Sequence, residues 1–200
     1  MRTQLPKMLF LGAAICLIAA SGLSAQTAGE NKTSSARPER IDFAFAYSTT
    51  RANAAGGSSF WMQGGDVQMH LLFYRELGLV IDFSGAHEGN IQSSGVGLDL
   101  VTNTSGLRYT WRPAQTRYSL YGQALGGIAS GFNSVFPSGS GATTSAQSLA
   151  VKLGGGLNVG MTRRIALRAI EADWLRTQFP NSTNGSQNNL QLNAGLILRF

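Results

Sequence analysis

The chain has 200 residues, of which 43% are hydrophobic and only 13% are charged, and it contains 25 glycines. So much glycine and so little charge argue against a helical protein. The formal net charge is +6, but no long block of Lys or Arg is present, so we expect no nucleic-acid partner.

The N-terminal segment predicts export. Arg2 and Lys7 precede the short apolar run MLFLGAAICLIAA, and the small-residue stretch SGLSAQ follows. This is the order of a cleavable signal peptide, which we expect to cover residues 1–25. The alternative is a retained anchor, but the run is shorter than the roughly 20 residues that a spanning helix needs. Cys16, the only cysteine, lies in this segment, so we expect neither disulfides nor thiolate metal sites.

The next residues differ from the rest of the chain. Residues 26–40, QTAGENKTSSARPER, are polar and have no apolar period. We expect them to form a flexible periplasmic lead-in. The remainder, residues 41–200, has the length of one domain.

From residue 41 onward, apolar residues recur at every second position, which predicts β-strands. In the last segment the apolar face carries Leu190, Leu192, Ala194, Leu196, Leu198 and Phe200, opposite Gln191, Asn193, Gly195, Ile197 and Arg199. Eight such segments cover residues 41–48, 66–74, 77–85, 106–111 (extending back to about Leu98), 118–129, 148–160, 165–179 and 188–200. No helical period competes with this pattern.

The predicted connections alternate in length. Three are short and cover residues 75–76, 112–117 and 161–164. Four are longer, rich in Gly, Ser and Asn, and cover residues 49–65, 87–97, 133–147 and 180–187. Short periplasmic turns at one end and longer external loops at the other are typical of a membrane-spanning barrel.

Polar and ionisable residues occupy the face opposite the apolar one. They are Asp42, Gln68, His70, Asp82, Arg108, Gln123, Lys152, Glu171, Asp173 and Arg199. The interior of an eight-stranded barrel is just wide enough for side chains to fill, and burying unpaired charge is costly. We therefore expect these residues to pair inside the lumen. Arg168 falls on the apolar face, where we expect its long side chain to snorkel toward water.

Aromatic residues decide between lipid and water outside the barrel. One predicted belt holds Phe73, Tyr74, Tyr109, Trp111, Tyr118 and Phe200, and the other holds Tyr47, Phe83, Trp174 and Phe179. Two belts are typical of membrane interfaces. The alternative, a secreted lipocalin-like barrel with an apolar interior, would pack seven charges around its ligand or expose eight apolar stripes. Because lipid requires every backbone group to be paired, we expect the first and last strands to close the barrel.

The segment NAGLILRF resembles the C-terminal targeting signature of bacterial outer-membrane barrels, with matches at Asn193, Gly195, Leu198 and Phe200. Residues 41–200 are similar to the outer membrane protein A-like β-barrel family. The resemblance implies an all-β, eight-stranded, antiparallel up-and-down barrel in the bacterial outer membrane. It also implies outer-membrane lipid and the barrel assembly machinery as partners. We expect no wall-anchoring role, because no peptidoglycan-binding domain follows.

The sequence assigns no catalytic residue, metal ligand or cofactor. The only histidines are His70, expected inside the barrel, and His87, expected in a solvated loop. No GxSxG elbow is present. The leading hypothesis is a small non-enzymatic barrel that serves envelope integrity or surface interaction through its long loops, whose ligand the sequence does not identify. The alternatives are a narrow porin-like conduit and a lipid A-modifying enzyme that uses His70 or His87.

Overall fold

The computed structural model describes residues 40–53, 58–91, 95–114, 116–138, 141–181 and 185–200. The predicted signal peptide, and the predicted lead-in up to residue 39, lie outside these ranges. Within the described ranges, no helix is long and apolar enough to cross a membrane.

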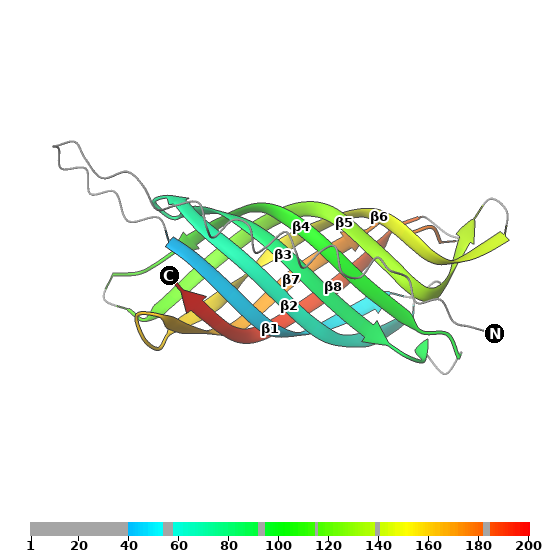
Figure 1. The fold of residues 1–200 in the computed structure, drawn as a ribbon, viewed down its shortest axis with the longest axis horizontal. Helices are drawn as coiled ribbons and strands as arrows, with labels where there is room; N and C mark the ends of the chain where they lie inside the picture. Colours follow the sequence, from blue (N-terminus) through cyan, green and yellow to red (C-terminus); the bar gives the residue numbers. More distant parts are fainter. Residues whose placement is uncertain (1–39, 54–57, 92–94, 115, 139–140, 182–184) are drawn as a thin grey trace, which may run out of the picture. The chain divides into compact units, whose positions relative to one another are not determined.

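Eight antiparallel strands close into one barrel in sequence order (Figure 1). They are β1 (Arg40–Asn53), β2 (Ser59–Tyr74), β3 (Leu77–Glu88), β4 (Leu98–Trp111), β5 (Tyr118–Ser138), β6 (Gly141–Gly160), β7 (Ile165–Thr177) and β8 (Gln187–Arg199). The predicted closure is confirmed, because β8 pairs with β1 from Arg199 opposite Asp42 to Leu190 opposite Arg51. The predicted fold class is therefore confirmed.

The strands are strongly tilted, as Figure 1 shows. The tilt can be followed in the strand register. Starting at Ile41 on β1 and moving from each residue to its partner on the next strand, the path goes once around the barrel and returns to β1 at Arg51, ten residues further along. A stagger of this kind accompanies strand tilts of about 35–45°. With eight strands it leaves an interior that side chains can fill.

The two ends of the barrel differ, although the β5–β6 connection at the long-loop end has only two residues and is as short as the β2–β3 turn. At the short-turn end, residues 75–76, 112–117 and 161–164 connect the strands. Arg75 has a φ of 46°, which suits its place in a two-residue hairpin turn. At the long-loop end, the connections cover residues 54–58, 89–97, 139–140 and 178–186.

The predicted loops 49–65 and 133–147 are too long. β1 continues to Asn53 and β2 already begins at Ser59, while β5 continues to Ser138 and β6 begins at Gly141. Their Gly-, Ser- and Thr-rich composition resembles that of loops. Backbone pairing within each hairpin nevertheless holds them as strands, for example from Phe136 opposite Thr143 to Ser138 opposite Gly141.

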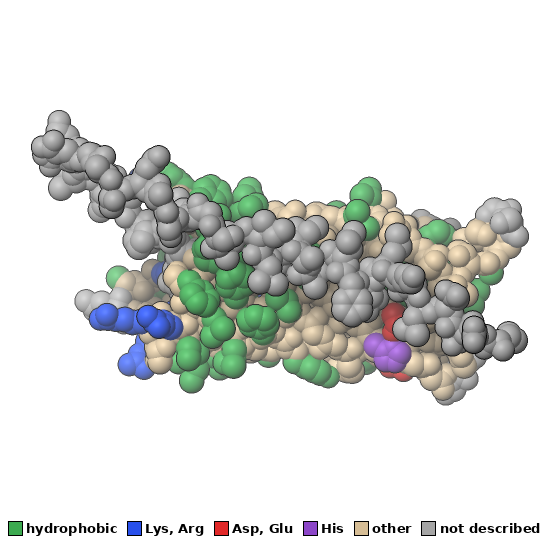
Figure 2. All heavy atoms as spheres, in the orientation of Figure 1, with side chains coloured by type: hydrophobic (Ala, Val, Ile, Leu, Met, Phe, Trp, Pro, Cys, Tyr) green, Lys and Arg blue, Asp and Glu red, His purple; other side chains and the backbone are tan. Residues whose placement is uncertain are grey.

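The outside of the barrel is apolar. Outward side chains such as Phe45, Val67, Leu107, Leu120, Leu153 and Leu196 are exposed, and Asn103 and Ser105 on β4 are polar exceptions. On the face drawn in Figure 2, apolar side chains gather over the half of the barrel nearer the short-turn end. The aromatic residues predicted for that end are all exposed. They include Tyr74, which a bulge between Leu72 and Tyr74 turns outward although its sequence parity predicts the inward face.

Candidate functional site

The lumen is the candidate site, and its contents change along the barrel. Toward the long-loop end it holds a cluster of buried apolar side chains, which we call the apolar plug: Ala52, Met62, Leu100, Ala129, Phe136, Ala150, Leu175 and Phe179. The ring centroids of Phe136 and Phe179 lie 5.5 Å apart. Phe179, predicted for an aromatic belt at the membrane interface, is only 6% exposed, so that prediction is wrong. The lumen is thus not polar along its whole length.

The middle of the lumen holds a charged layer centred on Lys152. The Lys152 Nζ donates to Asp82 Oδ1 over 2.6 Å and lies 3.9 Å from Asp66 Oδ2, and all three side chains are fully buried. Gln68 Nε2 and the Thr104 hydroxyl also donate to the Asp82 carboxylate, over 2.8 and 3.1 Å. Lys152 on β6 and Asp82 on β3 therefore connect two strands that are not neighbours in the barrel.

Glu171 on β7 is the second centre of this layer. Its carboxylate accepts hydrogen bonds from Gln68 Nε2 over 2.9 Å, from Asn193 Nδ2 over 2.7 Å and from the Tyr121 hydroxyl. Arg168 Nη1 lies 3.1 Å and Arg108 Nη2 3.5 Å from Glu171 Oε2. A buried carboxylate with two cations and three neutral donors is well compensated for the loss of water.

Arg108 extends the network across the barrel. Its Nη2 donates to Gln68 Oε1 over 2.5 Å, its Nε donates to Gln123 Oε1 over 3.1 Å, and its guanidinium lies 4.1 Å from the centre of the Tyr121 ring. Gln123 Nε2 in turn donates to Asp173 Oδ1 over 3.0 Å. Gly154 makes room for this carboxylate, because a Cβ there would lie 2.2 Å from Asp173 Oδ1.

The charges of this layer nearly balance. Four buried acids, Asp66, Asp82, Glu171 and Asp173, face three buried bases, Arg108, Lys152 and Arg168. Ion pairs or charged hydrogen bonds link these groups within the lumen. Paired side chains of this kind hold fixed positions and leave little free space between them.

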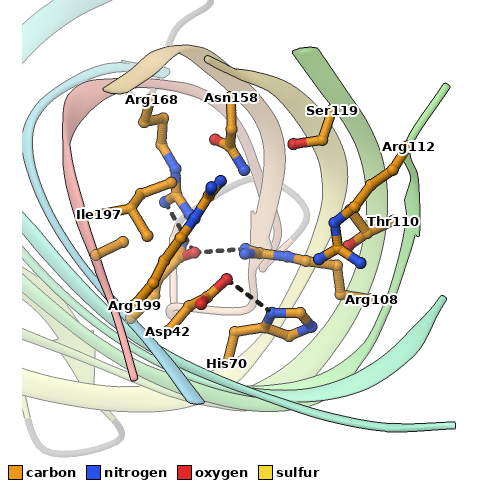
Figure 3. Close-up of a pocket in the computed structure, with 12 residues that line it drawn as sticks. Asp42, His70, Arg108, Thr110, Arg112, Ser119, Asn158, Arg168, Ile197 and Arg199 are labelled. Atoms are coloured by element: carbon orange, nitrogen blue, oxygen red, sulfur yellow. Dashed lines mark hydrogen bonds and ion pairs between the residues drawn. The ribbon is translucent and has the colours of Figure 1, made fainter. Parts of the chain in front are cut away.

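The short-turn end of the lumen forms a narrow polar mouth (Figure 3). Asp42, His70, Arg108, Arg112 and Arg199 are among the residues that surround a cavity of about 10 Å³. A space of this size holds about one water molecule. The His70 Nδ1 lies 3.9 Å from Asp42 Oδ2, so the histidine packs against an acid inside the barrel.

The structure places the ten predicted lumen residues at two levels. Asp42, His70 and Arg199 line the mouth, and Gln68 and Arg108 line the mouth and also belong to the charged layer. The other five, Asp82, Gln123, Lys152, Glu171 and Asp173, are buried in the charged layer. Of the targeting-signature residues, Asn193 also points inward, and Leu198 and Phe200 are exposed outside.

Three titratable members of the charged layer, Asp66, Tyr121 and Arg168, are absent from the ten predicted lumen residues. Asp66 lies two residues before Gln68, and Tyr121 two residues before Gln123. Since side chains alternate between the two faces of a strand, the sequence alone already predicts that Asp66 and Tyr121 face the lumen. Arg168 was expected outside but is 1% exposed and donates to Gln68 Oε1 over 2.8 Å. The reason is a bulge in β7 between Arg168 and Glu171, which reverses the parity of the preceding residues.

The other histidine lies on the outside, near the long-loop end. His87 Nδ1 contacts Asp99 Oδ1, and the other carboxylate oxygen of Asp99 accepts from Asn133 Nδ2. Among the described residues, no serine hydroxyl contacts this group. No group of three or more His, Cys, Asp or Glu side chains that could hold a metal ion occurs in the described ranges.

Comparison with known proteins relates the fold to solved structures. No protein-family model matches the chain, and no curated protein matches it significantly. Neisserial surface protein A is 14% identical, with a TM-score of 0.59, and the match covers 80% of this chain and 97% of that one. The attachment invasion locus protein Ail of Yersinia pestis, in complex with the heparin analogue sucrose octasulfate, is 17% identical, with a TM-score of 0.55 and coverage of 81% and 99%. The chain has the fold of eight-stranded outer-membrane barrels.

Proposed function

We propose that the chain is a non-conducting, non-enzymatic barrel of the bacterial outer membrane that acts through the surface at its long-loop end. The observation that carries the proposal is the filled lumen. A permeating ion would have to displace the apolar plug, break the pairs around Lys152 and Glu171, and pass a mouth with space for about one water molecule.

The exterior supports residence in a membrane. An apolar band between aromatic residues suits lipid, and a closed barrel leaves no unpaired strand edge within that band. The same surface on a protein in water would exceed the apolar patches of ordinary soluble proteins. The orientation follows from the connections, with the short turns in the periplasm and the longer ones outside the cell.

The targeting signature fits recognition before the barrel closes. In the folded chain Asn193 is buried and donates to Glu171, while Phe200 is 76% exposed. Only an unfolded or partly folded chain presents both residues together. We propose that the barrel assembly machinery recognises residues 193–200 at that stage.

The β5–β6 hairpin supports a role in surface interaction. β5 pairs with β4 only as far as Phe132, and β6 pairs with β7 only from Ala150, so the hairpin extends beyond both described neighbours (Figure 1). Val135 on this extension is 61% exposed. An extended hairpin with free edges can receive a partner through its backbone or its side chains.

Surface exposure of this hairpin is the first test of the proposal. A short epitope tag inserted between Ser138 and Gly141 is expected to bind antibody on intact cells. A control tag between Pro113 and Ala114, in the β4–β5 turn, is expected to bind only after the outer membrane is permeabilised. Antibody labelling of the control tag on intact cells would contradict the orientation, and labelling of neither tag would contradict surface display. Both tagged proteins should retain different migration in cold and boiled SDS gels.

The described residues do not provide the features that the two alternative functions, a narrow conduit and a lipid-modifying enzyme, require. A conduit needs a continuous aqueous path, which the apolar plug interrupts. A hydrolase of the serine type needs a nucleophile beside its histidine. His87 contacts an acid, but that acid also binds Asn133, and His70 lies inside the filled mouth. We therefore propose a binding rather than a catalytic role.

A further inference from the structure

The positive charge of the barrel is concentrated at its short-turn end. Among the described side chains, Arg75, Arg112, Arg117, Arg163, Arg164 and Arg199 lie at this end, with Asp42 and Glu76 as the acids. Outside the lumen at the long-loop end, Arg51 and Arg176 are matched by Glu88 and Asp99. Figure 2 shows Lys and Arg side chains gathered at the short-turn end on the face drawn.

Arginines and apolar side chains share one open groove beside the β6–β7 turn. Arg163, Arg164, Arg199 and Phe200 line this groove, which has a volume of about 540 Å³. The turn is held against β8, because the Arg199 backbone N–H donates to the Arg164 carbonyl over 2.8 Å. Phe200 forms the apolar wall; it is 76% exposed, and the centre of its ring lies 6.0 Å from that of Phe43.

A second groove lies on the other side of the same turn. Its walls include Arg117, Tyr118, Val159 and Met161, and its volume is about 610 Å³. The Gly160 backbone N–H donates to the Arg117 carbonyl over 2.7 Å, which fixes the β4–β5 and β6–β7 turns to each other. Tyr118 is 57% exposed, so this groove also has both an arginine and an aromatic residue among its walls.

We propose that these two grooves bind the headgroup phosphates of anionic phospholipids in the periplasmic leaflet of the membrane. Guanidinium groups bind phosphate through paired hydrogen bonds. Aromatic rings with one polar and one apolar side sit at the level of lipid headgroups. A soluble anion would use the arginines but would leave the apolar walls uncovered, whereas a phospholipid covers both. The inference rests on the proposed membrane location but is independent of the surface role of the β5–β6 hairpin.

The test is native mass spectrometry of the refolded protein with phosphatidylglycerol or phosphatidylcholine added. We expect the wild-type protein to retain more phosphatidylglycerol than phosphatidylcholine. The double variant Arg163→Gln/Arg164→Gln should lose about half of this binding, because it removes two arginines from the first groove and leaves Arg117 in the second. The matched control Arg51→Gln/Arg176→Gln removes the same charge at the other end and should bind phosphatidylglycerol like the wild type.

Equal retention of both lipids by the wild type, or equal losses in the two double variants, would overturn the inference. Each protein is first checked for folding by comparing its migration in cold and boiled SDS gels. Both variants should pass this check, because both pairs of arginines are exposed and the barrel should fold without them. Failure of the wild type in this gel test would instead contradict the membrane barrel itself.

Discussion

Replacing Lys152 with methionine is expected to lower the free energy of unfolding by about 3–5 kcal/mol, the usual cost of leaving a buried charge without its partner. Methionine approximates the length of the lysine side chain, so packing changes little. Asp82 keeps hydrogen bonds from Gln68 and Thr104, but it loses the cation 2.6 Å away. Asp66 is affected as well, because the remaining cation beside it, Arg168, lies 3.8 Å away.

The double variant Lys152→Met/Asp82→Asn distinguishes charge from packing. It removes one base and one acid together, so the net charge of the layer equals that of the wild type. We expect it to recover most of the stability that Lys152→Met loses. The free energies of unfolding of the single and double variants are measured by urea unfolding of the refolded proteins in lipid vesicles. Unfolding is followed by tryptophan fluorescence and by the intensity of the folded-protein band in unboiled SDS gels. If the double variant were as unstable as the single one, the charge argument would be wrong.

Replacing Arg168 with alanine is expected to have a similarly large effect, about 3–5 kcal/mol, because it leaves buried acids with fewer cations. Arg168 lies 3.1 Å from Glu171 and donates to Gln68 inside the lumen. Arg176 is the matched control, since it lies on the same strand but is exposed. Arg176→Ala should change the free energy of unfolding by about 1 kcal/mol or less.

This pair of variants also tests the bulge in β7. If Arg168 pointed outward, as its sequence parity suggests, both arginines would be exposed and the two alanine variants would unfold alike. Equal urea midpoints would therefore contradict the inward position. A lower midpoint for Arg168→Ala alone supports it.

The strands were predictable because membrane barrels have one apolar and one polar face on every strand. Alternation identified all eight strands, and the closure of β8 on β1 followed from the need to pair every backbone group. Loop lengths were less predictable. Composition around residues 49–65 and 133–147 resembles that of loops, whereas hairpin pairing beyond the apolar band depends on the opposite strand, which composition does not describe.

Two features of the lumen depend on geometry that alternation alone does not contain. A bulge adds one residue to β7, so Arg168 shares the lumen with Glu171 although the parity between them is odd. The apolar plug combines Met62, Phe136 and Phe179, which fall in predicted loops or a predicted belt, and contact between them requires the closed barrel. By contrast, Asp66 and Tyr121 had the correct parity and could have been assigned to the lumen from the sequence.

The central claim, a lumen sealed by the apolar plug and the charged layer, is tested most directly by single-channel recording in planar lipid bilayers. Only protein that migrates differently in cold and boiled SDS gels should be used, so that every inserted molecule is a closed barrel. A sealed lumen predicts a flat baseline, without steady conductance steps, over repeated insertions. Reproducible steps of constant size from the folded protein would contradict it and would favour the narrow conduit.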